Sequence, residues 1–212
     1  MRQLKDVQTF TKQIMNMMKT TAALLLLSIL LSVQSDYLPK PFVELLDRAK
    51  MHFEKPFGLE TTPLIENRQM NYEYALKYPK KQYEIRYAVR PLDQMIAQHE
   101  EAQRNKKEGD VSIHPNKLYS AMLTATVLNV SGGKNAEITT FNKNDVKDEF
   151  NADWGATAFF EVGEEFGQDY KYCLVVALHK DDCADAYIFY LAKTKKKFTE
   201  LMNLPFYALK FK

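Results

Sequence analysis

Residues 154–191, WGATAFFEVGEEFGQDYKYCLVVALHKDDCADAYIFYL, decide the fold class of this chain. Three stretches rich in apolar residues, 156–162, 170–178 and 184–191, are separated by two polar turns. Such runs bounded by turn residues are typical of β-strands, and tight turns join antiparallel neighbours. The middle run is apolar almost throughout, so we expect it to be an interior strand covered on both faces.

Residues 70–90 predict a further antiparallel hairpin. Apolar and polar residues alternate over 70–78 and again over 82–90, on either side of the polar turn Pro79-Lys80-Lys81. Strict alternation predicts one buried face and one face in water. On this pattern Glu84 and Arg86 belong to the solvent-facing side.

The rest of the chain alternates between helical and extended patterns. Apolar residues at helical spacing predict helices that pack on the sheet. Over residues 93–107, the predicted inner residues are Met95, Ile96, His99 and Ala102. The remaining helices are expected over 39–53, 114–131, 145–150 and 195–204, and a closing strand over 206–211. Together these elements predict an α+β fold, a mostly antiparallel sheet with helices packed on it.

This order of elements resembles the PsbP-like sandwich of exported bacterial proteins. The resemblance is carried by the three strands of 154–191 and by the terminal helix and strand ending in Tyr207-Ala208-Leu209-Lys210-Phe211. It covers about residues 57–212 and is one of pattern, so it implies the fold and no site residue. Members of that fold are mainly binding or assembly proteins, which implies the same class here.

The N-terminal segment predicts export. A lysine, Lys19, precedes the apolar run 22–33, and the run closes with the small residue Ser35. This order is typical of a secretory signal peptide, and the run is short of the roughly 20 residues of a membrane-spanning helix. We therefore expect a signal peptide over 1–35, a single α+β domain over 36–212, and a periplasmic or secreted location. Residues 1–17 fit a start extension before Met18; the alternative is an uncleaved signal anchor.

Charge and cysteine content restrict the partners. With 29 Lys and Arg against 27 Asp and Glu, the chain is nearly neutral, which gives no electrostatic footprint for nucleic acid. The two cysteines, Cys173 and Cys183, fall on one predicted hairpin in which Cys173 faces a residue near Tyr190. We therefore expect two free thiols rather than a disulfide.

The densest group of reactive side chains is His179-Lys180-Asp181-Asp182-Cys183. His179, Asp181 and Cys183 are the weak catalytic candidates, with His179 as a base and Cys183 as a nucleophile. Imidazole, carboxylate and thiolate also bind transition metals, but neighbours in a tight turn cannot all point at one ion. A solvated hairpin turn is the alternative interpretation, and we expect no metal and no cofactor.

Tyrosines form a second cluster. Tyr72, Tyr74, Tyr83 and Tyr87 would present a ligand platform if their rings line an exposed sheet face, because tyrosine combines apolar area with a polar tip. The alternative is that they pack under a helix as core.

The sequence favours an exported, non-catalytic binding or assembly protein of the cell envelope, with a protein or small ligand as partner. Its expected binding surface is a sheet face or the loops at Gly132-Gly133 and residues 163–168. The alternative is an exported hydrolase that uses His179 and nearby carboxylates. Convergence of His179 with acidic residues from distant segments would favour the hydrolase.

Overall fold

The computed structural model describes residues 38–78, 82–201 and 205–212. All the described residues belong to one compact unit, Leu38–Lys212. The predicted signal peptide, the turn at 79–81 and residues 202–204 of the last predicted helix lie outside the described residues. Within them, no helix is long and apolar enough to span a bilayer.

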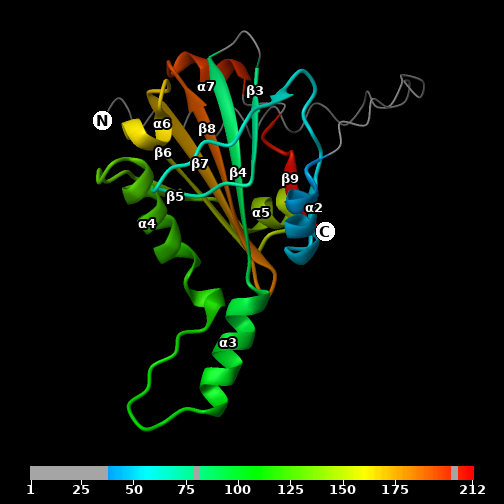
Figure 1. Cartoon of the computed structure of the whole chain (residues 1–212), viewed down its shortest axis with the longest axis vertical. Coiled ribbons are helices and arrows are strands. Elements are labelled where there is room, and N and C mark those ends of the chain that lie inside the picture. Colours follow the sequence, from blue (N-terminus) through cyan, green and yellow to red (C-terminus); the bar gives the residue numbers. More distant parts are fainter. Residues whose placement is uncertain (1–37, 79–81, 202–204) are drawn as a thin grey trace, which may run out of the picture. The chain divides into compact units, whose positions relative to one another are not determined.

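A seven-stranded sheet, antiparallel at every pairing, organises the fold (Figure 1). Its strands, in spatial order, are β2 (Glu60–Thr61), β3 (Tyr74–Lys77), β4 (Tyr83–Pro91), β8 (Ala184–Ala192), β7 (Tyr172–Lys180), β6 (Trp154–Glu161) and β5 (Ile138–Thr140). The three strands predicted over 154–191 and the hairpin of β3 and β4 are confirmed, with β7 an interior strand between β6 and β8. The short strand β1 (Met51–Phe53) pairs with β9 (Leu209–Phe211) in a second, two-stranded sheet.

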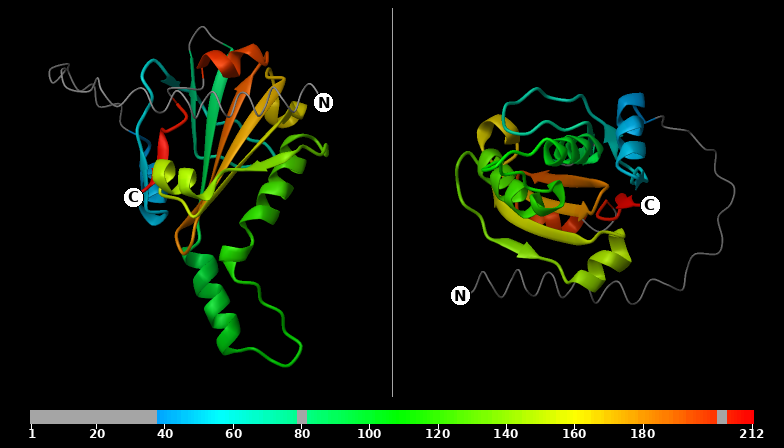
Figure 2. Two further views of the ribbon diagram at one scale, coloured as in Figure 1. Left: turned by 180° about the vertical axis from the view of Figure 1, so that it is seen from behind. Right: turned by 90° about the horizontal axis from the view of Figure 1, so that it is seen from below.

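Helices join these strands. They are α2 (Lys40–Arg48), α3 (Asp93–Arg104), α4 (Tyr119–Val130), α5 (Lys143–Phe150), α6 (Glu164–Gly167) and α7 (Lys196–Leu201), with a 3-10 turn η1 (Pro115–Lys117) before α4. The α+β class with a mostly antiparallel sheet is therefore confirmed. Viewed from below in Figure 2, α4 and α5 lie on opposite sides of the sheet.

Both faces of the sheet are covered. Leu123, Val127 and Val130 of α4 pack in one core cluster with β6, β7 and β8, which we call the α4 face. On the opposite side, which we call the α2 face, Phe42 of α2 stacks on Tyr74 with ring centroids 4.9 Å apart. The prediction of a wet face on the β3–β4 hairpin is therefore wrong.

The buried side chains on the α4 face include a charged pair. Because Arg86 lies opposite Phe189 and Glu84 opposite Leu191 in the β4–β8 register, both point into the α4 face. Arg86 is 1% exposed and Glu84 6% exposed. The alternation correctly predicts that Glu84 and Arg86 share one face, but this face meets a helix layer rather than water.

Two terminal predictions need correction. The helix expected over 39–53 ends at Arg48, Lys50 takes a left-handed conformation (φ 52°), and β1 follows. The helical spacing is overridden because Met51 and Phe53 are buried in a strand that pairs with β9. The closing strand is accordingly shorter than 206–211 and does not join the large sheet.

The segment 93–114 projects from the end of the sheet (Figure 1). It consists of α3 and a return segment, and we call it the arm. The helix prediction is confirmed, but its expected inner face is wrong: α3 has no buried residue, Met95 and Ala102 are exposed, and Ile96 and His99 are half-buried. The helical spacing in α3 does not mark a face that packs on the main core. His99, one of the predicted inner residues, instead contacts Ser112 and His114 of the return segment.

Candidate functional site

The β7–β8 hairpin places His179 against two carboxylates. His179 lies opposite Asp185 in the register of the two strands, and the Nδ1–Oδ1 distance is 2.6 Å. On the other side of the ring, Nε2 lies 3.0 Å from Oδ1 of Asp181 in the turn. Tyr119 of α4 stacks on the imidazole with centroids 4.3 Å apart, which leaves His179 only 1% exposed.

The carboxylates determine the charge of this histidine. Burial alone would lower the pKa of His179, but hydrogen bonds and attraction from Asp185 and Asp181 outweigh burial, and the net pKa is raised. The charged imidazolium is thus favoured between two acceptors. A ring with both nitrogens bonded to carboxylates is suited to holding a hairpin together, because neither nitrogen is free to take a proton from a nucleophile.

The other members of the turn point elsewhere. Asp182 makes a reciprocal pair of hydrogen bonds with Asn116, in which the Asn116 Nδ2 donates to Oδ1 at 2.9 Å and the Asp182 amide donates to the Asn116 Oδ1 at 3.1 Å. Cys183 is a buried free thiol. In the described part of the chain, no three His, Cys, Asp or Glu side chains gather in a way that could hold a metal ion. Both carboxylates that contact His179 come from its own hairpin, not from distant segments.

The hairpin turn instead holds the root of the arm. The Leu92 amide, immediately before α3, donates to the carbonyl of Cys183 at 2.9 Å. Asn116, two residues beyond the end of the arm, is bonded to Asp182 as described. Both ends of the arm are therefore fixed to one turn of the main sheet. Arg48 of α2 adds a third attachment, with two hydrogen bonds to Asp93 at 2.7 and 2.9 Å.

The tyrosine cluster is core in this structure. Tyr72, Tyr74, Tyr83 and Tyr87 are 6%, 2%, 0% and 0% exposed. Tyr74, Tyr83 and Tyr87 lie on the α2 face. There the ring of Phe53 packs edge-to-face against the rings of Tyr74 and Tyr87, with centroids 5.5 and 4.9 Å apart. Burial raises the pKa of Tyr83 and Tyr87 well above the usual value. The rings are covered, so the packing alternative describes them and an exposed platform does not.

The two glycine loops named from the sequence do meet. The amide of Gly163 donates to the carbonyl of Val130 at 2.8 Å, and a Cβ on Gly163 would lie 3.0 Å from the Gly132 nitrogen. Gly132 has a φ of 72°, which suits glycine at the end of α4. These glycines allow the end of α4 to pack closely against the start of α6.

A buried charged cluster beneath α6 was not predicted as a site. The Arg86 Nε donates to Oε1 of Glu84 at 2.6 Å, and its Nη1 donates to the carbonyl of Phe166. The guanidinium also lies against the rings of Tyr72 and Phe166, 4.9 and 4.8 Å from their centroids. The available signal was the pair of opposite charges two positions apart on one strand, which places them on the same face.

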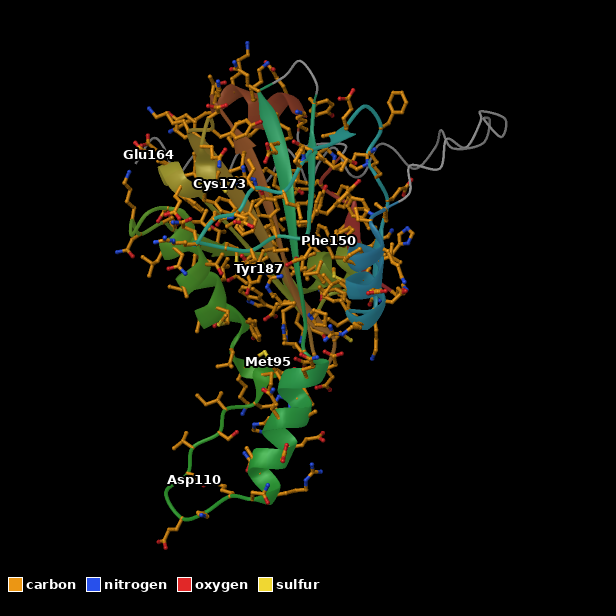
Figure 3. The ribbon with its side chains drawn as sticks, viewed as in Figure 1. Met95, Asp110, Phe150, Glu164, Cys173 and Tyr187 are labelled. Atoms are coloured by element: carbon orange, nitrogen blue, oxygen red, sulfur yellow. The ribbon has the colours of Figure 1, made fainter. Side chains whose placement is uncertain are left out.

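Cys173 lies on the same face of β7, opposite Leu191 and one residue from the predicted Tyr190. Its thiol is free and buried, and burial raises its pKa. Figure 3 shows Cys173 close to α6, the helix that begins at Glu164. The prediction of two free thiols is confirmed.

The arm carries the main exposed apolar side chains at this end of the molecule. Val111 is 87% exposed, Ile113 56% and Met95 44%, and Met122 at the start of α4 is 48% exposed. Figure 3 places Met95 where α3 leaves the sheet and Asp110 in the return segment. An arm with a fixed root and with exposed apolar side chains on α3 and on the return segment is suited to contacting another molecule.

No protein-family model matches the chain, and no curated protein is significantly similar to it. The structure defines the class: an α+β domain with a seven-stranded antiparallel sheet and a projecting helical arm.

Proposed function

We propose that this protein is an exported, non-catalytic binding or assembly protein of the cell envelope that contacts its partner through the arm. The apolar exposure of the arm carries this proposal. Exposed apolar surface rimmed by polar residues is typical of interaction sites. Of the seven exposed large apolar residues in the described part of the chain, Met95, Val111 and Ile113 belong to the arm, whereas Phe57 and Leu64 lie elsewhere.

The attachment of the arm supports the same proposal. A helix without buried side chains would be expected to move relative to the main body. Here, however, Leu92, Asp93 and Asn116 each form hydrogen bonds with the main body. A defined position reduces the entropy lost when a partner binds. The sheet faces offer no competing surface, because helices and aromatic side chains cover both of them.

The hydrolase alternative has weaker support. It relies on His179, whose two ring nitrogens are both engaged by carboxylates of the same hairpin. The thiol of Cys183 is buried, and the hydrogen bonds of the His179 ring go to Asp185 and Asp181 instead. An exported enzyme remains testable by assaying a His179→Asn variant for loss of any hydrolytic activity found in the parent.

Replacing residues 100–111 with a short Gly-Ser turn tests the proposal. The variant keeps His99, Ser112 and His114, and with them the contacts at the base of the arm. We expect it to fold with an unchanged melting temperature and to migrate as free protein on a native gel of envelope extract, where the parent migrates in a larger complex. A matched Val43→Ser change on α2, away from the arm, should leave the complex intact. A larger complex that survives this replacement would refute residues 100–111 of the arm as the binding element.

A further inference from the structure

A row of aromatic rings crosses one end of the α2 face, where β4 begins and β8 ends. The rings follow one another in the order Tyr78, Tyr83, Phe198, Phe159 and Tyr172, with neighbouring centroids 6.0, 6.2, 5.4 and 5.9 Å apart. Tyr83 and Phe198 are buried, whereas the other three rings are half-buried. The row therefore joins the core to the surface at this end of the sheet.

Lysines lie around the exposed part of the row. Residues 193–197, Lys-Thr-Lys-Lys-Lys, connect β8 to α7, and their lysines are exposed or half-buried. The Nζ of Lys195 lies 5.6 and 5.4 Å from the ring centroids of Phe159 and Tyr172. The Nζ of Lys171 lies 5.5 Å from the centroid of Tyr172. Ammonium groups and partly exposed rings thus share one surface.

An exposed aromatic side chain lies beside the same row. Phe57, in the turn before β2, is 93% exposed, more than any other large apolar residue in the described part of the chain. Its neighbour Gly58 lies against Tyr78, because a Cβ on Gly58 would be 3.8 Å from the Tyr78 Cε1. On β2 itself, Glu60 lies opposite Lys77, so these two charges offset each other. Phe57 is therefore free to enter an apolar environment next to the ring row.

Carboxylates neutralise only part of the positive charge. Glu200 pairs with Lys196 and Lys197 at 3.6 and 2.9 Å, and Glu161 approaches Lys171 at 3.9 Å. The acidic residues of α6 belong to the other side of the sheet, because α6 packs on the α4 face. Within the residues that the structure describes, the other two lysines of 193–197 form no ion pair. An excess of positive charge remains beside the rings.

We infer that this end of the domain docks on an anionic lipid bilayer. We call Phe57, the five rings of the row, Lys171 and residues 193–197 the basic end. Lysines attract the phosphate groups of anionic lipids, and amphipathic rings are favoured at the level of the headgroups. An exposed phenylalanine adds apolar contact with the acyl chains, which a soluble anion does not offer.

Docking in this way directs the arm away from the bilayer. β4 and β8 pair along their whole lengths, from Tyr83 with Ala192 at the basic end to Pro91 with Ala184 at the other end. The arm leaves β4 at this second end, and Figure 1 shows α7 and α3 at opposite ends of the sheet. The arm then stays accessible to a partner, but the docking itself does not rest on the proposed function of the arm.

Cosedimentation with lipid vesicles tests the docking. The protein, purified after export, is mixed with vesicles of phosphatidylcholine alone or with an equal part of phosphatidylglycerol. We expect binding to the anionic vesicles, weakened by added salt, and little binding to the neutral ones. A lysine near an anionic surface strengthens binding about fivefold, so Lys193→Gln with Lys195→Gln and Lys196→Gln should lower the partition coefficient about a hundredfold.

A second triple variant controls for net charge. Lys106→Gln with Lys107→Gln and Lys117→Gln removes the same charge from exposed lysines at the other end of the domain. This variant should bind the anionic vesicles almost as the parent does. Equal losses in the two triple variants would overturn the inference, because net charge rather than the basic end would then cause the binding. Absence of parental binding, or equal binding to neutral vesicles, would overturn it as well.

An introduced tryptophan locates the contact. Phe57→Trp is combined with Trp154→Phe, which keeps a ring beside Tyr119. Brominated lipids in the anionic vesicles should quench this tryptophan, whereas Val111→Trp on the arm, in the same background, should stay unquenched. Quenching at position 111 and not at position 57 would overturn the basic end as the docking surface. No protein partner takes part, so failure here is distinct from failure of the native-gel test.

Discussion

Removing Arg86 alone should be among the most destabilising single changes in this protein. Arg86→Met leaves Glu84 buried on the α4 face without the guanidinium that lies 2.6 Å from it. Breaking a buried ion pair by removing one partner costs about 3–5 kcal/mol, because the remaining charge has no water to replace the lost partner. We expect a loss of this size in the free energy of unfolding, together with lost packing of Tyr72 and Phe166 on the guanidinium.

The double variant Glu84→Leu with Arg86→Met separates charge from packing. Replacing both members of a buried pair by apolar residues is often neutral or stabilising by about 1–4 kcal/mol. The double variant should therefore be more stable than Arg86→Met, so the two changes are not additive. Arg48→Met, which removes an exposed pair with Asp93, is the matched control and should change the midpoint little.

Urea unfolding followed by the fluorescence of Trp154, the single tryptophan, measures all four proteins. If Arg86→Met lost less than about 1 kcal/mol, the burial of an uncompensated Glu84 would be refuted. If the double variant lost as much as the single one, packing rather than charge would explain the cost.

Three further results are expected. Folding raises the pKa of His179, so this residue contributes stability that is complete below a pH of about 6.5 and is lost as the pH rises through the higher folded pKa. The difference in stability between the parent and His179→Asn should therefore shrink from pH 6 to pH 9 in thermal melts. A difference that grew with pH would contradict the assignment. Gly163→Ala should lower the free energy of unfolding by about 1–3 kcal/mol in urea, because its Cβ would lie 3.0 Å from the backbone nitrogen of Gly132; an unchanged midpoint would mean that the two loops are not in contact. N-terminal sequencing of the exported protein should begin at about Asp36, and an intact apolar run from Leu24 would favour the signal anchor instead.

The fold class could be predicted because the strongest patterns lie in the longest strands. The stretches in 154–191 have few alternatives as regular structure, and the structure contains them with shifts of only a few residues at their ends. Residues 51–53 show the limit of local pattern. These residues continue a helical spacing, but they form a strand because they pair with β9, which lies at the other end of the domain in the sequence.

The charged pair of β4 shows a second limit. Alternation reports which residues share a face, and Glu84 and Arg86 do share one. It does not report whether that face meets water or a helix, since a paired Glu and Arg neutralise each other and can be buried. Coverage by α4 and α6 depends on how distant segments return to the sheet.

The candidate site depended still more on tertiary structure. His179 was selected for the density of reactive groups around it, and it does contact Asp181 of that group. Asp182, however, bonds to Asn116, and the imidazole stacks on Tyr119 of α4. His99 and His114 showed no spacing typical of a paired site. Only the path of the return segment brings them together, and no local pattern encodes that path.

The most direct test of the central claim is site-specific photocrosslinking in living cells. A photoreactive amino acid at Val111 on the arm is compared with one at Val43 on α2, which is 38% exposed and lies on the main body. The account predicts a discrete crosslinked adduct at Val111 and none at Val43. No adduct at Val111, or the same adduct at both positions, would contradict the arm as the surface through which this protein binds its partner.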